Sequence, residues 1–111
     1  MNKSRLCSSM ITICFTLITL SGAYGDDKKS YSADIEEGRI VSTQCAVCHG
    51  QNGEGNGAPK SKISGMDVDT FIKHIHDFKS GARKNVMMKR FVGMLSEKDI
   101  VNVAAYYASK E

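Results

Sequence analysis

The chain has 111 residues, of which 41% are hydrophobic and 24% charged, and its formal net charge is +3. These values are typical of one ordinary soluble domain and exclude a long disordered or fibrous chain. Lys3 and Arg5 supply two of the net positive charges, so the remainder of the chain is close to neutral. Nucleic-acid binding needs a clear excess of positive charge, and we therefore expect no nucleic-acid partner.

Residues 1–25 have the three regions of a secretory signal peptide. Lys3 and Arg5 give a positive start, a 15-residue run from Leu6 to Leu20 contains no charge, and small residues follow at 21–25. The run is short for a membrane-spanning helix, which needs about 20 apolar residues, although an uncleaved anchor is the alternative. The sequence predicts export to the periplasm, cleavage after Ala23 or Gly25, a polar linker over 26–32, and no membrane span in the mature chain.

Two of the four cysteines remain after removal of the signal, since Cys7 and Cys14 belong to it. The remaining pair lies in the pentapeptide CAVCH at 45–49, the attachment signature of a c-type haem. On one helical turn the two sulfurs can each form a thioether with a vinyl group of one porphyrin, and the imidazole falls beneath the iron. The motif predicts one covalently attached haem c, with Cys45 and Cys48 as thioethers and His49 as the proximal iron ligand.

Two other uses of the cysteine pair are open at this point. A thiol–disulfide exchanger carries its CxxC at the start of a helix after a strand, and no strand-like alternation precedes Cys45. A zinc site would combine the pair with His49 and either His74 or His76. Cys48 and His49 are adjacent and would both have to bind one ion, which is awkward. Haem attachment accounts better for the pair.

The mature part begins with a predicted helix that runs from Ala33 into the cysteine pair. Acidic residues at 34, 36 and 37 lie in its first turns, where negative charge interacts favourably with the helix dipole. Residues 35, 38, 40 and 41 fall near one face. Inside a helix, Gly38 costs about 1 kcal/mol relative to alanine, which indicates a close backbone contact with another helix.

After His49, four glycines in eight residues predict a loop that folds closely over a flat surface. It lacks the acidic ligands of a calcium loop and the ending of a phosphate loop.

A carbonyl near Pro59, the only proline of the chain, is expected to accept the Nδ1–H of the proximal imidazole. A second helix is capped by Asp67 or Asp69, runs to about Phe78 and ends at Ser80-Gly81. Residues 82–95 carry three methionines without a clear period. A capping box at Ser96 opens the last helix. Its apolar positions at helical spacing are Ile100, Val103, Ala104 and Tyr107. With no convincing strand, we predict an all-α fold.

With these features in order, the chain resembles a class I c-type cytochrome, most closely the small bacterial periplasmic members. The resemblance covers about Ala33 to Ser109. Beyond the haem pentapeptide it rests on Gly38, Gly53, Gly55, Pro59, Ile63-Ser64-Gly65, Phe78 to Arg83, Met87-Met88 and Leu95-Ser96. It implies a cytochrome c domain over 33–111, in which three to five helices wrap around one covalently bound haem. It also implies that the first helix crosses the last, with Gly38 letting Tyr106 or a neighbour approach closely.

The resemblance further implies a methionine as sixth iron ligand, several residues before the Leu-Ser that opens the last helix. Met88 fits this position best, and Met87 and Met94 are the next choices, although packing in the core is the commoner role of a methionine. The stretch between Pro59 and Ile63 is longer than is usual in the family. His74 or His76 would instead give bis-histidine iron. Because they are two residues apart on a helix and point to different sides, we expect both at the surface.

The function implied by the resemblance is that of a monomeric periplasmic electron carrier rather than an enzyme. Its donors and acceptors would be a dehydrogenase, an oxidase or a cytochrome complex. The alternatives are a haem-based sensor or peroxidase-like protein with a labile sixth ligand, or the electron-transfer subunit of a larger redox enzyme. The six basic residues between Lys73 and Arg90 form either a solvated face or a surface that attracts an acidic redox partner.

Overall fold

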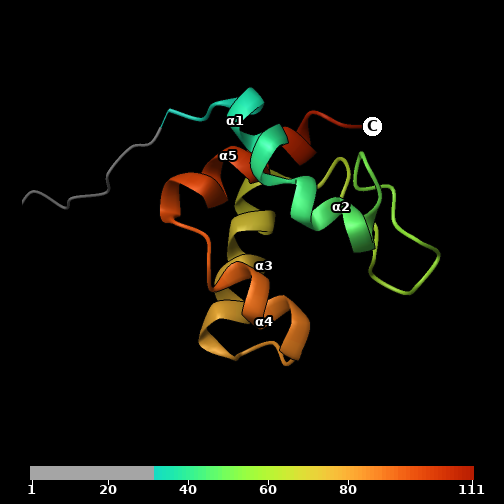
Figure 1. Ribbon diagram of the computed structural model, residues 1–111, viewed down its shortest axis with the longest axis vertical. Helices are drawn as coiled ribbons and strands as arrows, with labels where there is room; N and C mark the ends of the chain where they lie inside the picture. Colours follow the sequence, from blue (N-terminus) through green and yellow to red (C-terminus); the bar gives the residue numbers. More distant parts are fainter. Residues whose placement is uncertain (1–31) are drawn as a thin grey trace, which may run out of the picture.

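The computed structural model describes residues 32–111, so the predicted signal peptide and all but the last residue of the predicted linker lie outside it. The described residues form five helices and no strand (Figure 1). These are α1 (Ile35–Val41), α2 (Thr43–His49), α3 (Val68–Ser80), α4 (Val86–Val92) and α5 (Glu97–Ala108). The all-α prediction is confirmed. None of the helices in this part of the chain has the length and apolar character needed to cross a membrane.

The predicted first helix is two short helices that meet at Ser42. Asp34 caps α1, with its carboxylate accepting hydrogen bonds from the amides of Glu36 and Glu37 at 3.0 Å each. At the junction, the hydroxyl of Ser42 donates to the Arg39 carbonyl at 2.8 Å. Such side-chain bonds to the backbone compete with regular helix formation, which accounts for the break that the apolar pattern did not indicate.

Gly38 lies where α1 crosses α5 (Figure 1), as the sequence indicated. A Cβ at this position would overlap the backbone carbonyl of Asn102 and lie 3.0 Å from Cβ of Tyr106. The rest of the predicted apolar face of α1 is partly wrong, because Ile35 and Ile40 are each 51% exposed. Of the predicted face, Gly38 is buried and Val41 packs against the core.

Replacing Gly38 with alanine is therefore expected to destabilise the protein. The gain in helix propensity, about 1 kcal/mol, is smaller than the cost of separating two packed backbones, so we expect a net loss of roughly 1–3 kcal/mol. Urea unfolding of the haem-loaded protein measures the difference. Gly93→Ala is the matched control, because Gly93 already has right-handed helical angles and is exposed. Equal midpoints for Gly38→Ala and the wild type would refute the proposed reason for the glycine.

The core lies between α5 and its neighbours α1 and α3. The predicted apolar face of α5 is confirmed, since Ile100, Val103, Ala104 and Tyr107 are all at most 1% exposed. The ring of Tyr107 packs against that of Phe71 on α3, with centroids 5.8 Å apart. The predicted capping box at the start of α5 is present, formed by Ser96 and Asp99. Phe71 and Ile75, the core residues of α3, also line a cavity, so the core and the cavity meet on the same face of this helix.

Helix α4 lies inside the segment for which the sequence predicted no element. The amide side chain of Asn85 caps it by accepting the Met88 backbone N–H at 2.9 Å. Val92 is the one fully buried side chain of α4, whereas Val86 and Met87 are 85% and 57% exposed. A helix of seven residues with a single buried position has too few apolar repeats to produce a visible period. At α3, the structure selects Asp67 over Asp69 as the cap.

Candidate functional site

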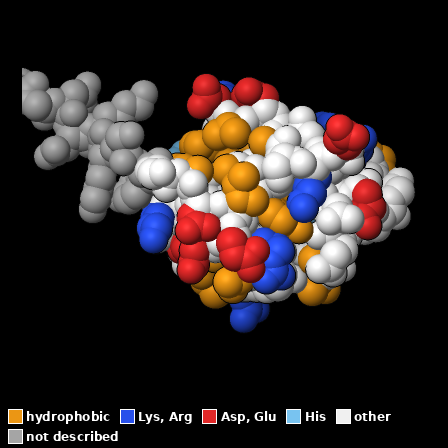
Figure 2. Space-filling view, turned by 90° about the horizontal axis from the view of Figure 1, so that it is seen from above, with side chains coloured by type: hydrophobic (Ala, Val, Ile, Leu, Met, Phe, Trp, Pro, Cys, Tyr) orange, Lys and Arg blue, Asp and Glu red, His pale blue; other side chains and the backbone are white. Residues whose placement is uncertain are grey.

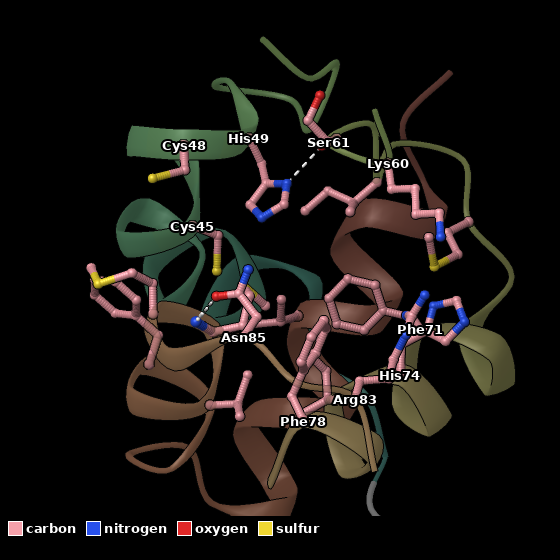
Figure 3. Close-up of a pocket in the computed structure, with 18 of the residues that line it drawn as sticks. Cys45, Cys48, His49, Lys60, Ser61, Phe71, His74, Phe78, Arg83 and Asn85 are labelled. Carbon is pink, nitrogen blue, oxygen red and sulfur yellow. Dashed lines mark hydrogen bonds between the residues drawn. The ribbon is translucent and has the colours of Figure 1, made fainter. Parts of the chain in front are cut away.

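A cavity of about 890 Å³ opens between α2, the loop after it, α3 and α4 (Figure 3). Its size is at the upper end of the range of about 300–1,000 Å³ that is typical of sites for small molecules and cofactors. Apolar side chains form most of its walls. These are Val41, Ile63, Met66, Phe71, Ile75, Phe78, Phe91, Val92, Leu95 and Val103. The cavity therefore suits a large ligand that is mainly apolar.

The four residues that the sequence singled out as cofactor ligands all line this one cavity. Cys45, Cys48 and His49 reach it from α2, and Met88 reaches it from α4. Cys45 and Cys48 are one helical turn apart, the spacing at which two side chains share a face. Side chains that are about forty residues apart in the sequence thus line the same cavity.

The methionines differ in their exposure and in whether they line the cavity. Met88 is half-buried and packs against the hydrophobic core. Met87 also lines the cavity but is 57% exposed, and Met94 is 63% exposed and does not line it. A fourth methionine, Met66, lines the cavity from the segment before α3. Met88 therefore combines access to the cavity with a fixed, packed position.

The imidazole of His49 is held by a backbone carbonyl. Its Nδ1 lies 2.6 Å from the carbonyl oxygen of Ser61 (Figure 3). Because a carbonyl only accepts, this contact requires the proton on Nδ1, which leaves the Nε2 lone pair free to bind a metal ion. The sequence predicted a carbonyl near Pro59, and the acceptor lies two residues beyond it.

The loop that carries Ser61 is fixed by its own hydrogen bonds. The Ser61 hydroxyl donates to the Ala58 carbonyl at 2.7 Å and accepts the Asn56 amide at 3.2 Å. Sequence reasoning missed this serine. The only signal was the unusual length of the stretch between Pro59 and Ile63, which shifts the acceptor along the chain.

Gly53 brings the glycine-rich loop against the core, as the predicted close folding requires. Its backbone has a φ of +78°, and a Cβ there would lie 2.7 Å from the ring of Tyr107. The Gly53 carbonyl accepts the amides of Ile63 and Ser64 at 2.8 and 2.9 Å. These contacts anchor both ends of the loop, so that Ser61 reaches His49.

Cys45 has the wrong environment for thiol exchange. It is half-buried against the core, and burial raises the pKa of its thiol. A reactive thiol of a disulfide exchanger needs a lowered pKa, because the thiolate is the nucleophile. The environment of Cys45 therefore argues against the exchanger.

The charged residues that line the cavity are all basic. Lys60 and Lys62 come from the loop after α2, Arg83 and Lys84 come from the segment between α3 and α4, and no carboxylate lines the cavity. His74 also lines it, so the prediction of a surface position for His74 is wrong in this respect. Burial, and secondarily the Arg83 guanidinium, lowers the pKa of His74. His76, by contrast, is exposed, with Nε2 3.2 Å from an oxygen of Glu97.

This set of residues fits a c-type haem. The apolar walls match the porphyrin, the basic rim matches its two carboxylates, and an imidazole, a thioether and two thiols face the space between. The zinc alternative has less support, since within residues 32–111 no three His, Cys, Asp or Glu side chains cluster as ligands of one ion. The thiols would hold the group covalently, and His49 and Met88, which both line the cavity, would be the ligands of its iron.

Comparison with known proteins agrees with this chemistry. The family described as cytochrome c oxidase, cbb3-type, subunit III matches residues 33–106. Cytochrome c-553 of Helicobacter pylori is 41% identical over 69 residues, which cover 61% of this chain and 72% of that protein. Cytochrome c4 of Pseudomonas aeruginosa is 30% identical over 80 residues, covering 72% of this chain and 40% of that protein.

A third relative is named for its role in electron transfer. The thiosulfate dehydrogenase electron acceptor of Stutzerimonas stutzeri is 33% identical over 86 residues, covering 68% of this chain and 40% of that protein. The chain thus spans about two fifths of the length of this relative and of the cytochrome c4. The likeness therefore covers only part of these longer proteins.

Proposed function

We propose that this chain, which belongs to the c-type cytochromes described by the cbb3-type oxidase subunit III family, is a periplasmic electron carrier with one haem. The observation that carries the proposal is the convergence of Cys45, Cys48, His49 and Met88 on one apolar cavity. In this assignment the two cysteines form the thioethers, His49 is the proximal iron ligand and Met88 the distal one. When bound, the haem supplies one-electron exchange between the ferrous and ferric states.

Several residues around the site hold the proposed iron ligands in fixed positions or exclude water from the cavity. Ser61 fixes the orientation and tautomer of His49 through the 2.6 Å contact, which also raises the basicity of the imidazole toward iron. Asn85 fixes the backbone of Met88 through its cap. Phe71, Phe78 and their apolar neighbours exclude water from the cavity walls. Ligands held in this way move little when the charge on the iron changes, which favours fast transfer.

The proposed donors and acceptors are other redox proteins: a dehydrogenase, an oxidase or a cytochrome complex. One relative is named as the electron acceptor of a thiosulfate dehydrogenase, which supports a dehydrogenase as donor. The family description names an oxidase subunit, and this favours the electron-transfer subunit of a larger redox enzyme as second candidate. Size measurement of the native protein distinguishes a monomeric carrier from a subunit of a complex.

The test is to purify the protein from the periplasm of cells that mature c-type cytochromes. We expect a new N-terminus at residue 24 or 26, one covalently bound haem per chain by the pyridine haemochrome assay, and a ferric spectrum with the weak near-infrared band of iron–methionine ligation. Carbon monoxide should bind poorly at neutral pH. A haem-free protein would refute the proposal, and strong carbon monoxide binding without the band would favour the sensor or peroxidase-like alternative.

A further inference from the structure

Tyr107 on α5 places a phenol hydroxyl inside the core of the domain. The residue is 0% exposed, and its hydroxyl oxygen lies 3.5 Å from the backbone carbonyl oxygen of Ser42, at the junction of α1 and α2. Burial raises the pKa of Tyr107, so the hydroxyl keeps its proton and remains a hydrogen-bond donor. Because the hydroxyl of a buried tyrosine usually has a partner, an acceptor for this proton is expected within the core.

The Ser42 carbonyl is a poor acceptor for the Tyr107 hydroxyl. Its oxygen already accepts the backbone amides of Cys45 at 2.9 Å and Ala46 at 3.0 Å. A carbonyl oxygen has two lone pairs, and these two amides use both. The distance of 3.5 Å between the hydroxyl and this oxygen is also well above the distance of about 2.7–2.8 Å that is typical of O–H···O bonds. The hydroxyl therefore has no strong acceptor at the junction of α1 and α2.

The sulfur of Cys45 is a second polar atom beside the hydroxyl. Cys45 packs against the core cluster that contains Tyr107, and the two groups are close enough to affect each other's pKa. Besides burial, the groups that act on the pKa of Tyr107 are Cys45, Ser42 and Tyr106. None of these is a charged side chain of the kind that covers the surface at the end of the molecule carrying α1 (Figure 2). The hydroxyl of Tyr106 is itself a donor to the Gln51 carbonyl at 3.4 Å, which leaves the Cys45 sulfur as the available acceptor.

Haem attachment would make the Cys45 sulfur a better match for this hydroxyl. A free thiol is both a weak donor and a weak acceptor. When its S–H bond adds across a vinyl double bond, a carbon–sulfur bond forms and the hydrogen goes to the other vinyl carbon, so no oxidant or reductant is needed. The sulfur of the thioether keeps its lone pairs but carries no hydrogen, and it can only accept. A buried hydroxyl without a strong acceptor then faces a sulfur that can only accept.

Cys45 lies between Tyr107 and the candidate haem site. Cys45 lines the cavity (Figure 3), whereas Tyr107 is not among the residues that line it. The hydroxyl can therefore act on a group in the cavity through this sulfur. Cys48, one turn further along α2, is exposed. The two sulfurs thus differ in their surroundings, since one is backed by a buried hydroxyl and the other is open to water.

We propose that Tyr107 is a positioning residue for Cys45, and that its hydroxyl donates a hydrogen bond to the Cys45 sulfur when the haem is attached. This inference rests on the proposed electron-carrier function. The bond holds one thioether against the core. It also directs the positive end of the O–H dipole toward the haem, which disfavours the additional positive charge of ferric iron. Tyr107 thereby raises the reduction potential, in the way that hydrogen bonds around a haem tune it.

The first test is proton NMR of the haem-loaded protein in the ferrous, low-spin state, which is diamagnetic. We expect the Tyr107 hydroxyl proton to give a separate resonance, because burial slows its exchange with water. It should show a nuclear Overhauser effect to the β-protons of Cys45, and Tyr107→Phe assigns it by its loss. A wild-type resonance that is lost to fast exchange, or that shows no such effect to Cys45, would overturn the proposal. The wild-type spectrum gives this answer even where a variant does not fold.

The second test compares two tyrosines of α5 by the reduction potential. Tyr107→Phe removes only the hydroxyl and keeps the ring that packs against Phe71. Tyr106→Phe is the matched control, because it removes the hydroxyl that donates to the Gln51 carbonyl, and Tyr106 does not line the cavity. At a fixed potential near the midpoint, we expect Tyr107→Phe to shift the ratio of ferric to ferrous protein about two- to fivefold toward ferric, the effect of one modest hydrogen bond. Tyr106→Phe should leave this ratio near the wild-type value, and equal ratios in the two variants would refute the proposal.

A double-variant cycle tests whether the effect passes through the sulfur. In Cys45→Ala the haem would be held by Cys48 alone, and adding Tyr107→Phe should then have no further effect on the ratio. A shift of the same size in this background would overturn the proposal, because the hydroxyl would act without Cys45. The pyridine haemochrome assay separates these outcomes from the electron-carrier function. A wild type without haem refutes that function, whereas a haem-loaded wild type with an unchanged ratio in Tyr107→Phe refutes only the role of Tyr107.

Discussion

Replacing Cys45 and Cys48 together with serine is expected to leave an unfolded protein. The described domain has 80 residues, and domains of this size bury a modest share of their surface. Its cavity of about 890 Å³ adjoins the core on α3 and α5, so without attached haem much of the apolar surface that should form the centre faces water. We expect the far-ultraviolet circular dichroism of the double variant to lose most of its helical signal. Its amide NMR signals should collapse to the narrow range of an unfolded chain.

Val47→Ser is the matched control for the double cysteine variant. Val47 lies between the two cysteines on α2 but is 86% exposed, so its replacement leaves the thiols and the core untouched. This variant should attach haem and fold like the wild type. A double cysteine variant that folded stably, with the wild-type helical signal and cooperative unfolding, would show that the fold does not depend on the attached group. The proposed role of the haem as part of the core would then be wrong.

Much of the fold was predictable because local chemistry and long-range packing agree. The capping box at Ser96 and the recurrence of apolar residues from Ile100 to Tyr107 describe one helix with one buried face, and α5 is that helix. Gly38 was informative for a different reason. A glycine does not stabilise the helix that contains it, so Gly38 indicated a close contact with another segment. That contact is with the backbone of Asn102.

The parts that were not predictable depend on side chains whose role is set by distant segments. Nothing local to Ser61 indicates that its carbonyl faces His49, twelve residues earlier. Both His74 and His76 were predicted to be exposed, and only the folded chain distinguishes them. His74 lines the cavity, whereas His76 contacts Glu97. For the same reason α4 was missed: its identity depends on one buried valine and one asparagine cap rather than on a repeated pattern.

A second substitution with a large expected effect is that of Met88, the proposed distal iron ligand. Met88→Ala is expected to retain the covalent haem, because the two cysteines and His49 are unchanged. It should lose the near-infrared band of iron–methionine ligation and bind carbon monoxide readily at neutral pH. The reduction potential should fall, since the thioether favours the ferrous state. A drop on the order of 0.1 V or more is reasonable against the ~0.8 V that axial ligands span.

The geometry around α4 makes this substitution an informative test of ligation. Asn85 caps the helix through the backbone N–H of residue 88, not through its side chain, so alanine leaves the cap in place and the segment folded. Met87→Ala and Met94→Ala are the controls, each removing an equally large side chain that is more than half exposed. Both should keep the band and the potential of the wild type. If Met87→Ala loses the band while Met88→Ala keeps it, the ligand is the exposed neighbour. The α4 helix must then turn further toward the cavity when haem binds, because Met87 lines the cavity with a side chain that is 57% exposed.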